Sequence, residues 1–318
     1  MEMETNTIIL DGPYLGYQAM FAMRNLHDDG EAPPTAHIMY AVLSRILAFG
    51  QTFRTNRFVI CWDSMESNRK AILPSYKEHR GDALTPEQKE SRIETKRQMR
   101  VLRQEVLPEI GFTNNFCKRG YEADDLIAQA CAETIDGDAI IVSADEDLLQ
   151  LLDARTRIYS PSKHAMVTSA IFQEEYGIYP SNWAMAKAYA GCDTDEVPGV
   201  KGVGIKTAIK YITGKLSPTS KAHAAITAPE VAQMVQRNLK LVRLPMAGTP
   251  LLQLGLDDFS LPSFKRICRQ YEYHSFLETE RLAEWERFFR GEFTTKESDV
   301  VQKMKVQQRN RAQGPTLL

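Results

Sequence analysis

The chain has 318 residues, of which 43% are hydrophobic and 25% charged, and its formal net charge is -2. These values predict a globular protein with one large domain or a main domain and an appendage, and they argue against a uniformly basic nucleic-acid binder. The five cysteines form no CxxC pair, which favours reduced thiols over a disulfide framework. Because the chain shows neither a signal peptide nor an apolar run near 18 residues, we expect a soluble, cytoplasmic protein.

Three short apolar runs are rich in β-branched residues and are followed by acidic side chains. The runs TIIL, RFVICW and DAIIVSA lead to Asp11, to Asp63, and to Asp145 with Asp147. Such runs are typical of buried parallel strands, and ligands of parallel sheets gather outside the carboxyl ends of the strands. We therefore expect these acids to lie at one edge of a sheet.

A second acidic group, Glu122, Asp124 and Asp125, opens a predicted helix. Two like charges about 4 Å apart repel by roughly 4 kcal/mol at an effective dielectric near 20, so a cluster of such acids needs protons or cations. Oxygen ligands without histidine favour Mg²⁺ or Mn²⁺ over zinc. Residues 122 and 124 point about 200° apart on a regular helix, so Glu122 should precede the first turn. The alternative for Asp125 is a helix-start carboxylate stabilised by the helix dipole.

Residues 69–103 carry ten basic and five acidic side chains, a local net charge of +5. A helix is predicted from Pro86 to about Ile110. One face of it carries a basic stripe, which is a candidate phosphate contact: Lys89, Arg92, Lys96, Arg100 and Arg103. The alternative is an ordinary solvated helix, because interspersed glutamates offer intrahelical partners.

After Asp147 the sequence predicts a short helix, a hairpin over residues 157–172, and a helical region from Ser181 to about Gly214. This region contains a glycine-rich turn followed by a helix from near Ile205. The turn and its flanking lysines could bind a phosphate: Gly199, Lys201, Gly202, Gly204 and Lys206. The acids that precede the turn could add metal ligands: Asp193, Asp195 and Glu196. A lone glycine turn can also serve only to change the chain direction. The polar stretch 291–318 is predicted to be a disordered tail.

Three stretches occur together and in order: GYEADDLIA (120–128), SADEDLLQLL (143–152) and VPGVKGVGIKTA (197–208). With them the chain resembles the flap endonuclease and 5′-3′ exonuclease family, which includes stand-alone bacteriophage enzymes and the nuclease domain of bacterial DNA polymerase I. The resemblance implies an α/β, parallel-sheet, PIN-like nuclease core over residues 1–180, with a helical arch at about 64–109. It also implies a helix-three-turn-helix DNA-binding region over 181–290 that can bind K⁺.

By the same resemblance, Lys77 and Arg80 would act on the scissile phosphate and Tyr76 would stack on a base. DNA contacts would come from Arg92, Lys96, Arg100, Lys201, Gly202, Gly204 and Lys206. Two ions, Mg²⁺ or Mn²⁺, would be held, the first by Asp11, Asp63, Glu122 and Asp124, and the second by Asp125, Asp145, Asp147 and an acid near residue 195.

The chain departs from the family in one motif. The bacterial pattern Gly-Asp-x-Ser-Asp-Asn-x-Pro-Gly appears here as GCDTDEVPG, so Cys192 occupies the place of the first aspartate, while Asp195 keeps its place. We expect Asp193 to substitute with a one-residue shift, because a thiolate is a poor partner for Mg²⁺.

The resemblance implies a structure-specific 5′ nuclease with exonuclease and flap endonuclease activity, which would remove RNA primers or flaps in replication by two-metal hydrolysis. Its partners would be DNA with a 5′ flap, nick or free 5′ end, RNA-DNA hybrids and replication proteins. We expect a monomer without a membrane partner, in a bacterial cell or a phage-infected host. Alternatives are a DNA-fork-binding protein with an impaired second metal site and a ribonuclease on a related four-acid fold. The segment QLGLDDF (253–259) faintly suggests a sliding-clamp peptide, although a core segment is the better interpretation.

Overall fold

The computed structural model describes residues 6–24, 36–134 and 136–293. Its strands and helices, in chain order, are β1 (Thr7–Asp11), α1 (Gly12–Arg24), α2 (His37–Phe53), β2 (Phe58–Cys61), α3 (Arg69–Ile72), α4 (Pro86–Val101), the π-helix η1 (Leu102–Val106), α5 (Leu107–Ile110), β3 (Asn115–Phe116), α6 (Ala123–Glu133), β4 (Ala139–Val142), the 3₁₀ helix η2 (Glu146–Leu151), β5 (Thr156–Ser160), β6 (Ala165–Val167), α7 (Ser169–Tyr176), η3 (Pro180–Asn182), α8 (Trp183–Ala190), η4 (Asp193–Asp195), α9 (Ile205–Ile212), α10 (Lys221–Ile226), α11 (Pro229–Val242), α12 (Leu261–Gln270), η5 (His274–Leu277) and α13 (Thr279–Phe289).

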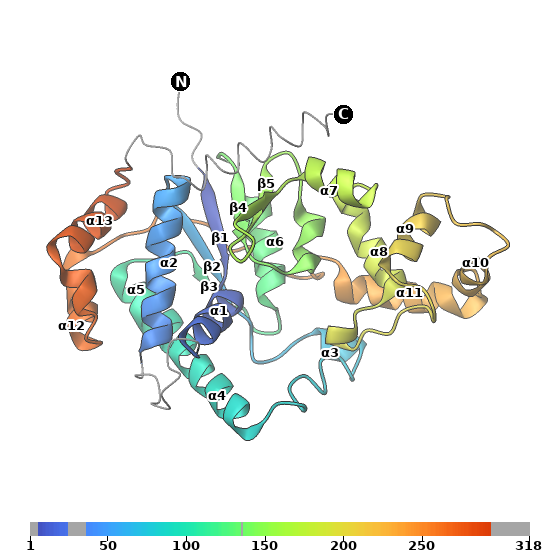
Figure 1. Cartoon of the computed structure of the whole chain (residues 1–318), viewed down its shortest axis with the longest axis horizontal. Helices are drawn as coiled ribbons and strands as arrows, with labels where there is room; N and C mark the ends of the chain where they lie inside the picture. The colour runs from blue at the N-terminus through green and yellow to red at the C-terminus, as the bar shows by residue number, and fades with distance from the viewer. Residues whose placement is uncertain (1–5, 25–35, 135, 294–318) are drawn as a thin grey trace, which may run out of the picture.

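The sheet at the centre of Figure 1 has the strand order β3-β2-β1-β4-β5-β6. All neighbouring pairs are parallel except β5 and β6, which form the predicted hairpin. The three apolar runs form β1, β2 and β4, and every residue of these strands is buried. The predicted α/β class with buried parallel strands is thus confirmed, and the acidic residues follow the carboxyl ends of adjacent strands.

Helices cover both faces of this sheet. Along β1, Ile8 and Leu10 point into one core and Ile9 into the other, which is the two-residue alternation of a pleated strand. The first core is closed by α1, α2, α4, α5, α12 and α13, and the second by α6 to α11. The C-terminal helices α12 and α13 therefore return to the face covered by α2. The division of the chain at residue 180 stays a prediction.

The segment between β2 and β3 contains α3 and the long helix α4, which runs along the lower edge of the molecule in Figure 1. The start of α4 is explained by its sequence: Thr85 accepts a hydrogen bond from the N–H of Gln88, the Gln88 amide accepts one from the N–H of Thr85, and Pro86 takes the first helical position. The predicted helix to Ile110 is present, with a π-helical turn at η1 before α5.

The C-terminal half continues through α8 to α11, on the right of Figure 1. The segment 253–259 was expected to be core, but Leu256 within it is 81% exposed and Asn114 exchanges hydrogen bonds with Gly255. Most of the predicted tail, residues 294–318, lies outside the described residues. Within the described part of the chain, no helix is both long enough and apolar enough to cross a membrane.

Candidate metal centre

Asp11 ends β1 and is only 7% exposed. One carboxylate oxygen accepts a hydrogen bond of 3.0 Å from the N–H of Tyr14, and the other accepts one of 2.8 Å from the Ser143 hydroxyl. Burial outweighs these hydrogen bonds and, together with the charges of Asp63 and Asp145, raises the pKa of Asp11 to about 7.

Asp63, Asp124 and Asp145 complete a group with Asp11 that we call the strand-end carboxylates. Asp63 accepts a 2.9 Å hydrogen bond from the N–H of Ala123, the first residue of α6. Burial, followed by the charges of Asp145, Asp11 and Asp63, raises the pKa of Asp124 well above its ordinary value. Burial also raises the pKa of Asp63 and of Asp145. These four side chains therefore lie close enough to disfavour one another's charge, and their role as metal ligands stays a prediction.

Glu122 differs from these four acids. It precedes the first turn of α6 in an extended conformation (φ -92°, ψ 163°), as the helical geometry predicted. Its Oε2 lies 2.8 Å from Nζ of Lys77, which also lies 3.6 Å from Asp195 Oδ1. Burial acts to raise the pKa of Glu122, but the charges of Lys77 and Arg69 outweigh it and lower that pKa.

The structure corrects the role of Tyr76. Its side chain is 3% exposed, and its hydroxyl lies 3.1 Å from Glu122 Oε2 and 3.3 Å from Asp195 Oδ2. The Lys77 ammonium covers the ring at 4.9 Å from the centroid. A nucleotide base cannot reach this ring, so the prediction that Tyr76 stacks on a base is wrong.

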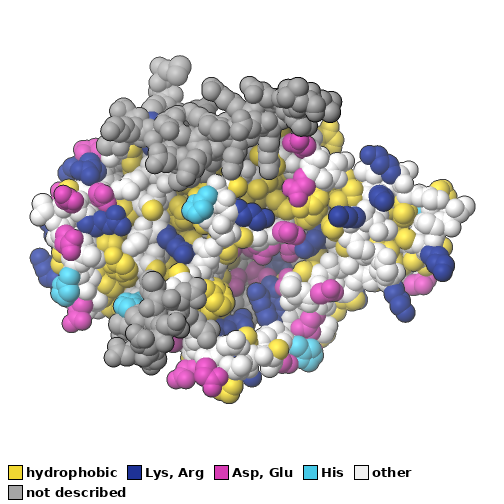
Figure 2. All heavy atoms as spheres, viewed as in Figure 1, with side chains coloured by type: hydrophobic (Ala, Val, Ile, Leu, Met, Phe, Trp, Pro, Cys, Tyr) yellow, Lys and Arg dark blue, Asp and Glu magenta, His cyan; other side chains and the backbone are white. Residues whose placement is uncertain are grey.

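Arg80 is exposed, at the edge of the same site. Burial raises the pKa of Asp63 and of Asp195, and the charges of Lys77 and Arg80 act in the opposite direction on both carboxyl groups. Both basic side chains therefore lie near the acids, as expected for groups that could reach a phosphate there. Figure 2 shows acidic side chains gathered in a hollow in the middle of this face, with Lys and Arg side chains beside them.

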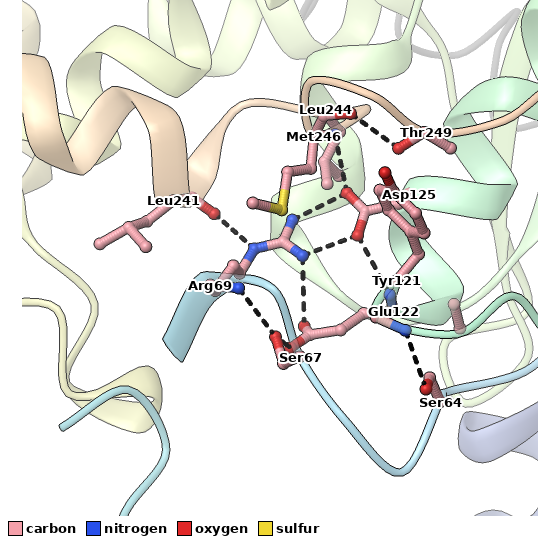
Figure 3. Close-up of polar contacts among 12 residues, drawn as sticks. Ser64, Ser67, Arg69, Tyr121, Glu122, Asp125, Leu241, Leu244, Met246 and Thr249 are labelled. Carbon is pink, nitrogen blue, oxygen red and sulfur yellow. Dashed lines mark hydrogen bonds and ion pairs between the residues drawn. The ribbon is translucent and has the colours of Figure 1, made fainter. Parts of the chain in front are cut away.

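Asp125 is engaged elsewhere (Figure 3). Arg69 donates to both of its carboxylate oxygens, at 2.6 and 2.8 Å, and the N–H groups of Glu122 and Met246 donate at 3.1 and 2.8 Å. Arg69 Nε donates to the carbonyl of Leu241, at the end of α11. Asp125 is fully buried, and these four hydrogen bonds occupy both of its oxygens. The prediction of Asp125 as a metal ligand is corrected accordingly: it anchors α6 to α3 and α11.

Asp147 and Asp195 meet Cys192 rather than Asp193. The Sγ of Cys192 and one carboxylate oxygen from each of Asp147 and Asp195 lie within 4.8 Å of one another, and in the described part of the chain no other three Cys, His, Asp or Glu donors do so. Asp193 is exposed and outside this group, so its expected one-residue shift into the site is not observed. Lys187 of α8 places Nζ 2.6 Å from Asp147 Oδ1.

Four members of the basic stripe lie on α4, with Lys89, Lys96 and Arg100 exposed, and the fifth, Arg103, is half-buried in η1. Arg92 is half-buried, and its guanidinium donates a 3.1 Å hydrogen bond to the Tyr17 hydroxyl and stacks over that ring. Three of these side chains are therefore free of protein neighbours that would cover them, whereas Arg92 is held against α1.

The glycine-rich turn connects α8 to α9 through residues 191–204. A Cβ on Gly199 would lie 2.1 Å from the carbonyl oxygen of Ala190, so only glycine fits there. At Gly202, φ is +78° and nothing lies within 4 Å of a built Cβ, which leaves its backbone open to solvent. The four residues predicted to contact a phosphate are all exposed around the start of α9: Lys201, Gly202, Gly204 and Lys206.

The donor chemistry decides which ions fit. The strand-end carboxylates offer only oxygen ligands and carry raised pKa values, so a hard divalent cation such as Mg²⁺ or Mn²⁺ fits them. The group of Asp147, Cys192 and Asp195 contains a thiol and is already paired with Lys187, so it does not fit Mg²⁺.

Sequence reasoning missed three residues of the site: Arg69, Ser143 and Lys187. Each acts on an acid at least 40 positions away: Arg69 on Asp125, Ser143 on Asp11 and Lys187 on Asp147. The signal for Ser143 was its place at the end of the third strand; for Lys187, it was its place on the helix that leads into the GCDTDE motif.

Residues 6–177 match the protein family described as the 5′-3′ exonuclease, N-terminal resolvase-like domain. The 5′-3′ exonuclease of Bacillus subtilis is 32% identical over 270 residues, which cover 81% of this chain and 82% of that protein. The thermostable DNA polymerase I of Thermus thermophilus is 30% identical over 249 residues, and the match spans 28% of the polymerase.

Among solved structures, a bacteriophage T5 flap endonuclease, in a pseudo-enzyme-product complex with DNA and metal ions, superposes with a TM-score of 0.64 at 22% identity. The match covers 84% of this chain and 99% of that one. At this identity the likeness concerns the fold, and it confirms the predicted PIN-like nuclease core.

Proposed function

The chain belongs to the flap endonuclease and 5′-3′ exonuclease family, and we propose that it is a divalent-metal-dependent 5′ nuclease that hydrolyses phosphodiester bonds near a 5′ end or flap of DNA. The observation that carries this proposal is the grouping of the strand-end carboxylates, which act on one another's charge, beside Lys77 and Arg80. Acids that raise one another's pKa need protons or a cation, and hydrolysis of a phosphodiester is helped by a cation and by neighbouring positive charge.

The strand-end carboxylates would hold a divalent cation, which would supply an activated water at neutral pH and stabilise the leaving 3′ oxygen. Hydrogen bonds from the N–H of Tyr14 and the hydroxyl of Ser143 orient Asp11 for that role. In the proposal, Lys77 exchanges its contact with Glu122 for a phosphoryl oxygen, and Arg80 approaches from the solvent side. Products would carry a 5′ phosphate.

The finer parts of the proposal rest on the family relationship and on the exposed basic groups. We propose that the glycine-rich turn holds duplex phosphates and binds K⁺, and that α4 contacts the strand with the free 5′ end. Both contacts concern phosphates, so binding would depend on salt and not on base sequence. We propose that the protein removes primers or flaps during replication, on DNA or RNA-DNA hybrids. We also propose that it acts as a monomer.

A second candidate is a DNA-fork-binding protein that cleaves poorly. It is favoured by one observation, the pairing of Asp147 with Lys187 beside Cys192, which leaves little negative charge for a second hard cation. In that case two-metal hydrolysis with two Mg²⁺ ions would not operate at full rate.

Product mapping tests the proposal. Flap, nicked and RNA-primed duplexes, each labelled at the 5′ end or the 3′ end, are incubated with the protein in Mg²⁺, Mn²⁺ or EDTA. We expect metal-dependent cleavage near the 5′ end, lost in Asp145→Asn and retained in Glu146→Gln, a matched change at an exposed neighbouring acid. Tight binding of forked DNA without cleavage in Mg²⁺ or Mn²⁺ would refute the proposed nuclease function and favour the fork-binding protein.

A further inference from the structure

Asp147 lies at the start of η2, Cys192 directly precedes η4 and Asp195 ends η4, and the three present donor atoms within 4.8 Å of one another. In a tetrahedral zinc site, metal-sulfur bonds of about 2.3 Å and metal-oxygen bonds of about 2.0–2.2 Å place the ligand atoms roughly 3.5 Å apart. Small side-chain rotations would therefore close this group around an ion.

The backbone holds the donors in place. Cys192 and Val197 exchange two backbone hydrogen bonds, of 2.9 and 3.0 Å, and the N–H of Asp195 donates to the Cys192 carbonyl at 3.2 Å. The carbonyl of Asp195 in turn accepts from the N–H of Lys77. The sulfur and the Asp195 carboxylate thus sit on one short, closed loop, and little order has to be gained when a ligand binds.

The charges of the group disfavour a hard ion. The ammonium groups of Lys187 and Lys77 lie 2.6 Å from Asp147 and 3.6 Å from Asp195, so each carboxylate has a cationic neighbour before any metal arrives. Mg²⁺ would have to compete with both lysines through oxygen ligands alone. A soft or borderline ion gains an additional bond to sulfur, which Mg²⁺ does not form.

We propose that Asp147, Cys192 and Asp195 form a mixed sulfur-oxygen site for a thiophilic divalent cation, such as Zn²⁺ or Co²⁺, in place of a second Mg²⁺. The site uses three protein ligands and leaves a fourth position open to water or a phosphate oxygen, as catalytic zinc sites do. Binding releases the Cys192 thiol proton to solvent. As a second-ion site, the inference rests on the proposed nuclease function, but the binding itself does not.

Cobalt(II) provides the test, because a thiolate bound to Co²⁺ gives a sulfur-to-metal charge-transfer band that oxygen ligands do not give. The full chain is titrated with Co²⁺ while excess Mg²⁺ fills the strand-end carboxylates. We expect the band in the wild-type protein and in Cys117→Ser, a matched change at another half-buried free cysteine. In Cys192→Ser we expect no band and a weaker Co²⁺ affinity, because the sulfur ligand is lost.

Two further readouts keep the test decisive. Zn²⁺ should protect Cys192 of the wild-type protein from alkylation, measured by mass spectrometry, which needs no variant. Cys192→Asp should bind Mg²⁺ more tightly and Co²⁺ without the band. Absence of the band at saturating Co²⁺, or its persistence in Cys192→Ser, overturns the inference even if Mg²⁺-dependent cleavage is normal. If the band depends on Cys192 but the protein cleaves no substrate, the inferred metal site is supported and the proposed nuclease function is refuted.

Discussion

The two sides of the acidic centre hold similar side chains in different electrostatic states. On one side, burial and mutual repulsion raise the pKa of Asp11, Asp124 and Asp145. On the other side, Lys77 lies against Glu122, whose pKa is lowered, and Lys187 lies against Asp147. The number of acidic residues therefore does not show how many cations the centre binds. Lysines from other elements neutralise the acids on one side, which we call the lysine-paired side, and the acids on the other side, the unsatisfied side, have no such partner at hydrogen-bond distance among the residues that the structure describes.

Replacing Asp124 by asparagine removes one carboxylate from the unsatisfied side, and we expect it to have the largest effect on cleavage activity. We expect Mg²⁺-dependent cleavage to fall by about 1,000-fold or more, because a ligand and part of the charge that holds the cation are lost. The metal-free variant should melt at a higher temperature than the wild-type protein, because repulsion is relieved. Flap cleavage and thermal melting in EDTA measure the two effects, and an active variant would count against the assignment.

Replacing Arg69 by methionine tests the anchor beneath the lysine-paired side. The change leaves Asp125 buried without its bidentate partner, and we expect a loss of about 3–5 kcal/mol in the free energy of unfolding, measured in urea. Arg119→Met, which removes an exposed ion pair with Glu66, is the matched control and should leave the urea midpoint unchanged. Equal effects of the two changes would refute the anchoring role.

Lys77→Met tests the lysine-paired side, because Lys77 neutralises Glu122 and Asp195 and is proposed to act on the scissile phosphate. We expect kcat to fall by about 100- to 1,000-fold while the Kd for a flap substrate changes little. Single-turnover kinetics separate the two quantities. A variant that loses binding and keeps its rate of chemistry would assign Lys77 to substrate binding alone.

The unsatisfied side also predicts a pH dependence in EDTA. Folding raises the pKa of Asp11 from 3.8 to about 7, so its proton stabilises the folded state at low pH and this stability is lost as pH rises from about 4 to about 7. The urea midpoint of the metal-free protein should fall over this range, and less so in Asp11→Asn. Saturating Mn²⁺ should abolish the fall, and a midpoint that rises with pH in EDTA would contradict the assigned shift.

We expect the smallest effect from substitutions on α4, which lies outside the acidic centre and would change only the salt dependence of DNA binding. Lys96→Ala removes one exposed charge, and we expect the slope of log K against log salt for duplex binding to fall by about 1. Arg97→Ala, which changes a side chain already paired with Glu94, should alter the slope less. Identical slopes for all three proteins would exclude α4 from the DNA contact.

The sequence predicted those parts of the molecule that depend on local pattern. The apolar runs located β1, β2 and β4, and therefore the edge where Asp11 and Asp63 lie; helical geometry placed Glu122 before α6. It failed where a side chain meets a partner distant in the chain. Asp125 pairs with Arg69, 56 positions away, and the Tyr76 hydroxyl is bound to carboxylates at positions 122 and 195, which no local pattern contains.

The central claim is that the strand-end carboxylates hold a catalytic divalent cation. Anomalous diffraction from crystals soaked in Mn²⁺ tests it most directly, because it locates the ion without reference to activity. We predict an anomalous peak among Asp11, Asp63, Asp124 and Asp145 in the wild-type protein and none there in Asp124→Asn. An empty hollow at saturating Mn²⁺, or a peak only at other residues, would contradict the account.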